Sequence, residues 1–146
     1  MAEPLVLNVV RLHPEARLPQ RATDGASGLD LCACLPDGDL VLGPDPALVP
    51  TGVAIEFPRG YDVQVRPRSG LSLEGVGVAF GTIDSDYRGE VLVTMWAFGS
   101  RREHRLRHGD RIAQLVVAQL AELPVVEVEA LTPSTRGAAG HGSTGA

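Results

Sequence analysis

The chain has 146 residues, which is enough for one domain with a hydrophobic core and not comfortably enough for two. Its 13 basic residues face 18 acidic ones, and the net charge of -5 argues against a protein that coats nucleic acid. All 13 basic residues are arginine, and the absence of lysine excludes a P-loop nucleotide site and Schiff-base chemistry. Any anion that this chain binds must therefore be held by arginine, backbone amides or a metal ion.

The N-terminal residues do not have the pattern of a targeting segment. Glu3 is acidic, and no basic region precedes the first apolar residues, so no signal peptide is predicted. No apolar run approaches the roughly 18 residues that a membrane span needs. We therefore expect a cytoplasmic protein without a membrane partner.

Short apolar runs, separated by Gly, Pro and Asp, recur along most of the chain. They cover residues 5–12, 29–35, 47–57, 61–66, 76–80, 90–98, 111–120 and 124–130. β-Branched residues are enriched in these runs, and short strands with turn signals between them are typical of a sandwich, barrel or jelly roll. One short helical turn is expected at residues 69–74. The prediction is a single all-β domain.

The two cysteines, Cys32 and Cys34, are separated by one residue in the second predicted strand. This spacing is unfavourable for a disulfide between them, and two ligands are too few for a zinc site. We predict two reduced thiols and no metal cage.

A run of charged residues covers positions 101–108 (RREHRLRH). It has no aromatic residues between the charges, as a surface that stacks on bases would have. We therefore predict a solvated connection between two strands and no stable nucleic-acid partner.

The tail, residues 132–146 (TPSTRGAAGHGSTGA), is rich in Gly, Ser, Thr and Ala and has no apolar anchor. Composition alone favours a flexible terminus. However, Arg136 and His141 lie within a glycine-spaced run, and bare amides and hydroxyls beside an arginine are what a phosphate-wrapping arm requires. Both interpretations remain open from the residues alone.

The stretch with the most chemical information is residues 81–90 (GTIDSDYRGE). Asp84 and Asp86 would point to the same side of a strand, with Tyr87 on the opposite side unless a turn intervenes. A hairpin with this composition can hold a general base beside a substrate, and it is also an ordinary acidic hairpin tip.

Three further stretches carry weaker signals. In residues 67–71 (PRSGL), an arginine, a hydroxyl and free amides precede the predicted helical turn, as in an anion site, although Ser69 as a helix cap explains the same pattern. Residues 109–114 (GDRIAQ) pair an arginine with Gln114, and residues 26–31 (ASGLDL) place Asp30 at a strand start. Each of these two is also an ordinary turn followed by a strand.

Taken in this order, the stretches resemble the five motifs of the trimeric dUTP pyrophosphatase (dUTPase) family. The matches are ASGLDL (26–31), PRSGLS (67–72), GTIDSDYRGEV (81–91), GDRIAQLVV (109–117) and RGAAGHGSTG (136–145). The resemblance implies a jelly-roll-like β-barrel subunit, here a domain of residues 1–131 with a mobile arm of residues 132–146. It also implies a homotrimer whose active sites are shared between subunits, and cleavage of dUTP to dUMP and pyrophosphate with Mg²⁺.

The resemblance also implies a role for each matching residue. Asp84 corresponds to the carboxylate that activates the attacking water, and Ser69 to the hydroxyl that bonds the departing phosphate bridge. Tyr87 corresponds to the ring that excludes a 2′-hydroxyl. The phosphate chain would be held by Arg68, Gly70 and Gln114, and the uracil by the backbone of Thr82 and Ile83. Asp30 would act on Mg²⁺ through water, and the arm would contribute Arg136, His141, Gly142 and Ser143. For Arg111 the resemblance leaves a structural or interfacial role open.

Two positions depart from the family pattern. His141 occupies the place of a phenylalanine that stacks on uracil, and an imidazole stacks less strongly but can also donate a hydrogen bond. Val78 occupies the place of an asparagine that helps to hold uracil, so any such help must come here from backbone groups.

Two other functions remain alternatives. A dCTP deaminase shares the expected fold, and a non-catalytic nucleotide-binding trimer would need the fold alone. The hairpin with Asp84 and Tyr87, together with the complete glycine-rich tail, favours pyrophosphate release.

Overall fold

The computed structural model describes residues 4–100, 102–142 and 145. The elements within these residues are short strands and one short helix. In chain order they are β1 (Asn8–Arg11), β2 (Gly28–Cys32), β3 (Leu40–Leu42), β4 (Ala47–Glu56), β5 (Tyr61–Arg66), α1 (Ser69–Leu73), β6 (Val76–Val78), β7 (Gly81–Ile83), β8 (Glu90–Ala97), β9 (His104–Leu106) and β10 (Arg111–Gln119). The alternation of buried and exposed residues along β8 shows why these segments are strands, since one face packs inward and the other does not.

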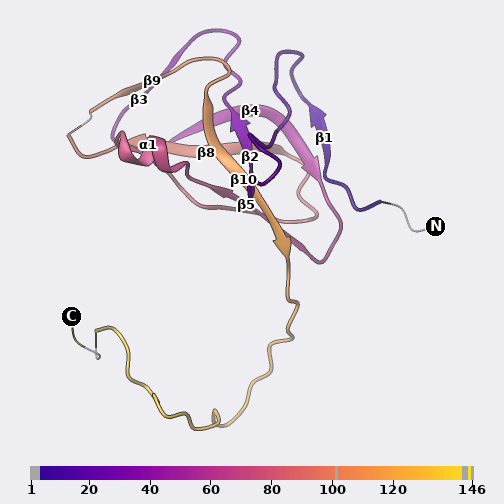
Figure 1. Ribbon diagram of the computed structural model, residues 1–146, viewed down its shortest axis with the longest axis vertical. Coiled ribbons are helices and arrows are strands. Elements are labelled where there is room, and N and C mark those ends of the chain that lie inside the picture. The colour runs from indigo at the N-terminus through magenta and orange to yellow at the C-terminus, as the bar shows by residue number, and fades with distance from the viewer. Residues whose placement is uncertain (1–3, 101, 143–144, 146) are drawn as a thin grey trace.

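The strands form two four-stranded antiparallel sheets and one two-stranded sheet. The orders are β1-β4-β8-β6, β2-β10-β5-β7 and β3-β9, so most neighbours in a sheet are distant in sequence. The two large sheets pack together over a single core of mainly Val, Leu and Ile side chains. The predicted all-β, jelly-roll-like fold is confirmed (Figure 1).

The predicted helical turn is also confirmed, one residue shorter than expected. Helix α1 begins at Ser69, and Arg68 occupies the cap position without a side-chain hydrogen bond to the helix. The alternative interpretation of Ser69 as the helix cap is therefore not supported, because Ser69 is the first residue of the helix and the cap position precedes it. Among the described residues, no helix is long and apolar enough to cross a membrane.

The prediction of a strand at residues 124–130 is wrong. This segment leaves the body after β10 and pairs with no strand in the described part of the chain (Figure 1). Its apolar side chains are exposed, and Val125 is 100% accessible. The alternation of valine with glutamate is typical of a strand, but a strand needs a pairing partner, and residues 4–100, 102–142 and 145 supply none for this segment.

The prediction of a wholly solvated connection at residues 101–108 is also wrong in part. Residues His104–Leu106 form β9, which pairs with β3, and Leu106 is only 1% exposed. Leucine is the only apolar residue in this charged run, so the run gives little strand signal by itself. The pairing with β3 places Leu106 in the core.

Strand β4 contains a bulge that matters for the site. Its pairing with β8 shifts between Pro50 and Ala54. In the bulge, Gly52 has a φ of 68°, and the Thr51 hydroxyl donates a hydrogen bond of 2.6 Å to the carbonyl of Val91. Bulges redirect a strand locally, and this one fixes the beginning of β8.

Candidate active site

The hairpin that follows β7 forms one wall of a cavity of about 220 Å³. Thr82, Ile83, Asp84 and Tyr87, four residues of the predicted site, line this cavity together. The backbone N–H of Tyr87 donates to the carbonyl of Asp84 at 3.0 Å, and this turn brings the two side chains to the same cavity. Asp86 does not line the cavity. The expectation that Asp84 and Asp86 share a side holds only for a continuous strand, which the turn interrupts.

The phenol of Tyr87 is held from one end and is 45% exposed. Its hydroxyl donates to the backbone carbonyl of Glu90 at 2.9 Å. The Glu90 carboxylate in turn accepts a hydrogen bond of 2.8 Å from the backbone N–H of Gly52 in the β4 bulge. Through these two hydrogen bonds, the Tyr87 ring is connected by way of Glu90 to the β4 bulge.

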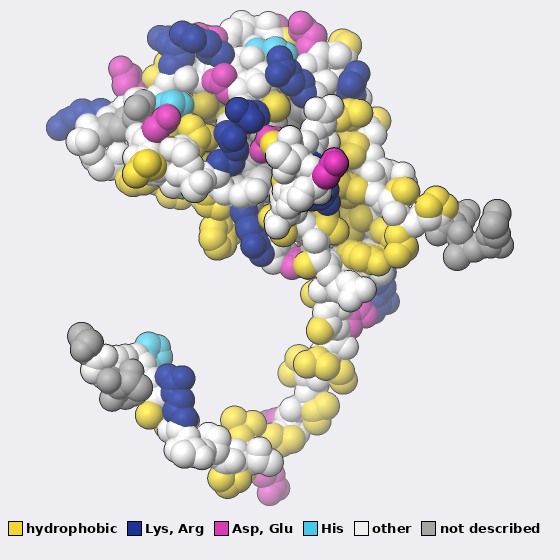
Figure 2. Space-filling model, in the orientation of Figure 1, with side chains coloured by type: hydrophobic (Ala, Val, Ile, Leu, Met, Phe, Trp, Pro, Cys, Tyr) yellow, Lys and Arg dark blue, Asp and Glu magenta, His cyan; other side chains and the backbone are white. Residues whose placement is uncertain are grey.

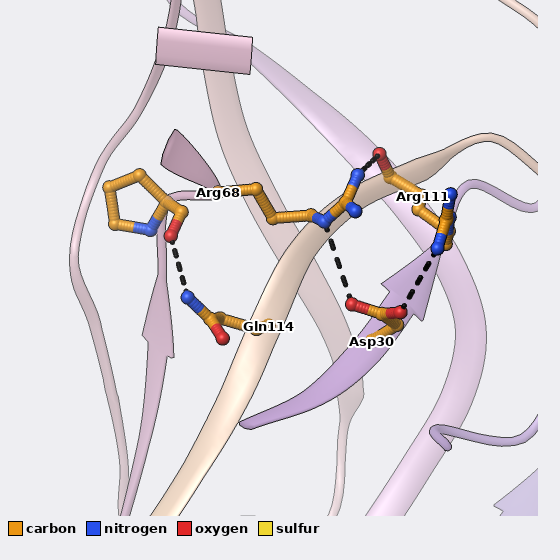
Figure 3. A network of polar contacts seen from close by, with 5 residues as sticks. Asp30, Arg68, Arg111 and Gln114 are labelled. Carbon is orange, nitrogen blue, oxygen red and sulfur yellow. Dashed lines mark hydrogen bonds and ion pairs between the residues drawn. The ribbon is translucent and has the colours of Figure 1, made fainter. Parts of the chain in front are cut away.

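A second group of predicted residues meets where the middle of β2, the segment after β5 and the start of β10 come together (Figure 3). Asp30 Oδ1 lies 3.5 Å from Arg68 Nε, and Asp30 Oδ2 lies 3.6 Å from Arg111 Nη1. Arg68 also donates to the backbone carbonyl of Arg111 at 3.3 Å. These contacts give Arg111, whose role was left open, a definite place as an ion-pair partner of Asp30.

Gln114 joins this network from the middle of β10. Its Nε2 donates to the carbonyl of Pro67 at 2.9 Å, which fixes the chain just before Arg68 (Figure 3). An ideal Cβ at Gly28 would lie only 2.2 Å from Gln114 Oε1, so the glycine gives the amide its space. Ser69 and Gly70 follow Arg68 and are exposed, with open space around Gly70.

The arm carries the remaining predicted residues away from both groups. Arg136, His141 and Gly142 are exposed, and Arg136 Nε donates to the carbonyl of Ala139 at 2.6 Å. His141 has a φ of 51°, in the left-handed region that non-glycine residues seldom adopt. Ser143 lies outside the described residues. Figure 2 shows the chain after β10 as a thin extension, with exposed apolar side chains on the stretch that precedes the arm.

Val78 lies elsewhere. It is on β6, is 6% exposed and belongs to the hydrophobic core, and it does not line the hairpin cavity. In this chain the side chain of residue 78 is therefore a packing residue.

One chain brings the predicted residues together in three separate groups. The hairpin cavity and the Asp30 network share no residue, and the arm contacts neither through any described hydrogen bond or ion pair. The residues predicted to bind the base and those predicted to bind the phosphates therefore belong to two different groups within one chain.

A larger cavity of about 660 Å³ also has Asp30 in its lining. Arg11, Arg17, Arg21 and Arg111 line it together with Cys32. Arg21 is occupied with the carbonyls of Ala26 and Ser27, at 2.8 and 3.1 Å. Burial raises the pKa of the Cys32 thiol, and the nearby Arg17 guanidinium opposes this shift. Both cysteines are free thiols, as predicted.

The dUTPase family model matches residues 14–145. The chain belongs to the dUTPase family. A deoxyuridine 5'-triphosphate nucleotidohydrolase of Methylocella silvestris is 47% identical over 153 residues, with 100% of this chain and 95% of that protein covered. A protein of the same name from Caulobacter vibrioides is 50% identical over 133 residues, with 88% and 85% covered.

A solved structure supports the same relationship. The dUTPase of Staphylococcus bacteriophage 80alpha, determined with dUpNHpp, is similar to this chain with a TM-score of 0.85 and 28% identity. The similarity covers 97% of this chain and 99% of that one. The resemblance drawn from the five motifs is thus confirmed as family membership.

The dUTPase hairpin cavity also contains residues that sequence reasoning missed. Val65, Glu90, Val91 and Leu92 line it beside the predicted residues. Glu90 and Val91 lie inside the matched stretch 81–91, so the motif itself contains their signal. Val65 and Leu92 carry no polar group that would single them out, and only the pairing of β5 with β7 brings Val65 to the hairpin.

The oxygen ligands available at Asp30 fit a metal ion that is held mainly by the phosphates of a bound nucleotide. Among the described residues, no group of three or more His, Cys, Asp and Glu side chains is placed to hold a metal. Mg²⁺ commonly binds through one or two carboxylates, several waters and substrate phosphates. Each oxygen of Asp30 has lone pairs beyond its contact with an arginine, so it can also accept a hydrogen bond from a metal-bound water.

Proposed function

We propose that this chain hydrolyses dUTP to dUMP and pyrophosphate in the presence of Mg²⁺. The observation that carries the proposal is the hairpin cavity of a dUTPase-family chain, lined by both Asp84 and Tyr87. The reaction limits uracil incorporation into DNA and supplies dUMP for thymidylate synthesis.

Asp84 is assigned as the general base. Its carboxylate lies at the cavity, is exposed, and has no ion pair described within this chain. It takes a proton from the water that attacks the α-phosphorus, and the bond from that phosphorus to the bridging oxygen breaks to release pyrophosphate. Proton transfer of this kind contributes typically about 10²–10⁴-fold to the rate.

Tyr87 is assigned to the sugar. Its ring forms part of the cavity wall. We assign it to exclude a 2′-hydroxyl, and we assign the backbone of Thr82 and Ile83, which also line the cavity, to the base. The cavity volume of about 220 Å³ is below that of sites for drug-sized ligands, about 300–1,000 Å³, and suits a nucleoside without its phosphates. Excluding a group by steric clash is an effective route to specificity.

The phosphate chain is assigned to the Asp30 network. Arg68 offers a planar fork of donors, and Ser69 and Gly70 offer an exposed hydroxyl and exposed amides beside it. Gln114 positions this segment through its hydrogen bond to Pro67. With no lysine in the chain, arginine and backbone groups are the donors that remain for the phosphates.

Mg²⁺ is assigned to the triphosphate, with Asp30 contacting it through water. When bound there, it supplies positive charge to the phosphate oxygens. The ion pairs of Asp30 with Arg68 and Arg111 orient its carboxylate for that contact.

A homotrimer with shared sites completes the proposal. Two facts support it: the base and phosphate groups lie apart in one chain, and the segment after β10 exposes Leu123, Val125, Val126 and Leu131 without a partner among the described residues. We assign residues 132–146 as the arm that closes over a neighbouring site, with Arg136 and Ser143 on the terminal phosphate and His141 over uracil. Gly142, between His141 and Ser143, is assigned to the same substrate-binding stretch of the arm.

Product analysis tests the proposal directly. The purified protein is incubated with dUTP, UTP, dCTP or dTTP, each with Mg²⁺ or with EDTA, and pyrophosphate and ammonia are measured. Pyrophosphate from dUTP, dependent on Mg²⁺, is the expected result. Ammonia from dCTP would support the deaminase alternative, and binding of dUTP without any product would support the non-catalytic trimer.

A further inference from the structure

Gly89 lies directly under the phenol of Tyr87. An ideal Cβ built on Gly89 would be 2.4 Å from Tyr87 Oη, 2.6 Å from Cζ and 3.0 Å from Cε2. All three nearest atoms belong to this one ring. Real Cβ atoms essentially never make contacts shorter than 3.0 Å, so a side chain at residue 89 would require the Tyr87 phenol to shift from this pose.

The backbone itself does not require glycine at this position. Gly89 is not among the glycines with positive φ, in contrast to Gly52 in the neighbouring bulge, whose φ is 68°. An alanine at residue 89 would therefore meet no conformational strain of the left-handed kind. The backbone conformation therefore gives no reason for a glycine at residue 89. What a side chain at this position would meet is Tyr87, which occupies the space beside the glycine.

We propose that Gly89 is a specificity-determining positioning residue, which acts on the sugar through Tyr87. The inference rests on the proposed function, in which Tyr87 excludes the 2′-hydroxyl. Without a Cβ at residue 89, the ring can lie close over the backbone, and its hydroxyl can reach the carbonyl of Glu90 at 2.9 Å. Gly89 itself does not line the cavity, so it has no direct contact to offer a substrate there.

The β4 bulge fixes the position of Glu90, whose carbonyl accepts the hydrogen bond from the Tyr87 hydroxyl. Gly52 N–H holds the Glu90 carboxylate at 2.8 Å, and Thr51 holds the Val91 carbonyl, so the acceptor for the Tyr87 hydroxyl does not move freely. The ring is therefore confined between a fixed acceptor and a bare backbone. Restoring an ordinary contact of at least 3.4 Å between a Cβ at residue 89 and Tyr87 Oη would displace the phenol by about 1 Å. A misplacement of about 1 Å can cost about 10²-fold in rate.

The test uses a double-mutant cycle of Gly89→Ala and Tyr87→Ala. For all four proteins, kcat/KM is measured for dUTP and for UTP, and melting temperature is measured at one protein concentration. We expect Gly89→Ala to lower the preference for dUTP over UTP by about tenfold or more, and to add nothing in the Tyr87→Ala background. Gly43→Ala is the matched control, because Gly43 also lacks a positive φ and has nothing within 4 Å of an added Cβ.

An unchanged preference in Gly89→Ala, or an equal loss in both Tyr87 backgrounds, overturns the proposal. If Gly89→Ala does not fold, recovery of folding in the double variant supports it, and failure to recover overturns it. If the wild-type protein hydrolyses no dUTP, the proposed function fails on its own; the preference is then measured as binding of dUMP against UMP by the same proteins.

Discussion

Replacing Asp84 by asparagine tests the assignment of the general base. The substitution keeps the size of the side chain and its ability to accept hydrogen bonds, but removes the group that takes a proton from water. Asp84 is exposed and has no ion pair described in this chain, so the fold should not depend on its charge. Exposed substitutions of this kind usually change the free energy of unfolding by less than about 0.5 kcal/mol.

The expected loss is in turnover. General-base catalysis is worth about 10²–10⁴-fold, so the activation free energy of Asp84→Asn should rise by about 2.7–5.4 kcal/mol. Binding should be retained, because Thr82, Ile83 and Tyr87 still form the cavity and the Asp30 network still offers its donors.

The chain supplies a matched control two residues away. Asp86 is also exposed and carries the same charge, but it does not line the cavity. The assay is pyrophosphate release from dUTP with Mg²⁺ under single-turnover conditions, together with dUMP binding, for wild type, Asp84→Asn and Asp86→Asn. Near-normal turnover in Asp84→Asn, or an equal loss in Asp86→Asn, would refute the assignment.

Three further predictions concern the arm, the bulge and the thiols. Removing residues 132–146 should leave the melting temperature of the body unchanged and strongly reduce dUTP turnover; unchanged turnover would show that the tail is only a flexible end. Thr51→Val leaves the Val91 carbonyl without its hydroxyl donor and should lower the free energy of unfolding by about 1–3 kcal/mol in denaturant titrations, whereas Thr51→Ser keeps the bond. Burial raises the pKa of the Cys34 thiol, so its contribution to stability is present below the pKa of an unfolded thiol, about 8.5, and is lost as pH rises through the folded pKa. The free energy of unfolding of the wild-type protein should therefore fall above that pH. The free energy of unfolding of the Cys34→Ser variant should fall less over the same pH range.

The sequence by itself determined the family and the chemical groups. Motif residues such as Asp30, Arg68 and Asp84 carry their chemistry in residue type, order and spacing, all of which are read directly from the chain. The period-two pattern of strands such as β8 is equally direct, because a half-buried strand must alternate. These features are local, and local rules predict them.

Only the tertiary structure decided how these groups are arranged. The pattern at residues 124–130 looks like a strand, but a strand exists only where another chain segment supplies its hydrogen bonds, and here none does among the described residues. Conversely, Leu106 enters the core from a charged run because β3 lies beside it. Pairing depends on partners distant in sequence, and no local pattern contains them.

The same reason applies within the site. Asp84 and Tyr87 share a cavity because a turn, closed by one hydrogen bond, overrides the alternation of a strand. Gly89 looks like any hairpin glycine in the sequence, and its purpose becomes visible only when the ring of Tyr87 occupies the space of its missing side chain. Composition states which groups are available, whereas exclusion of one atom by another is decided by distances that arise only when the chain has folded.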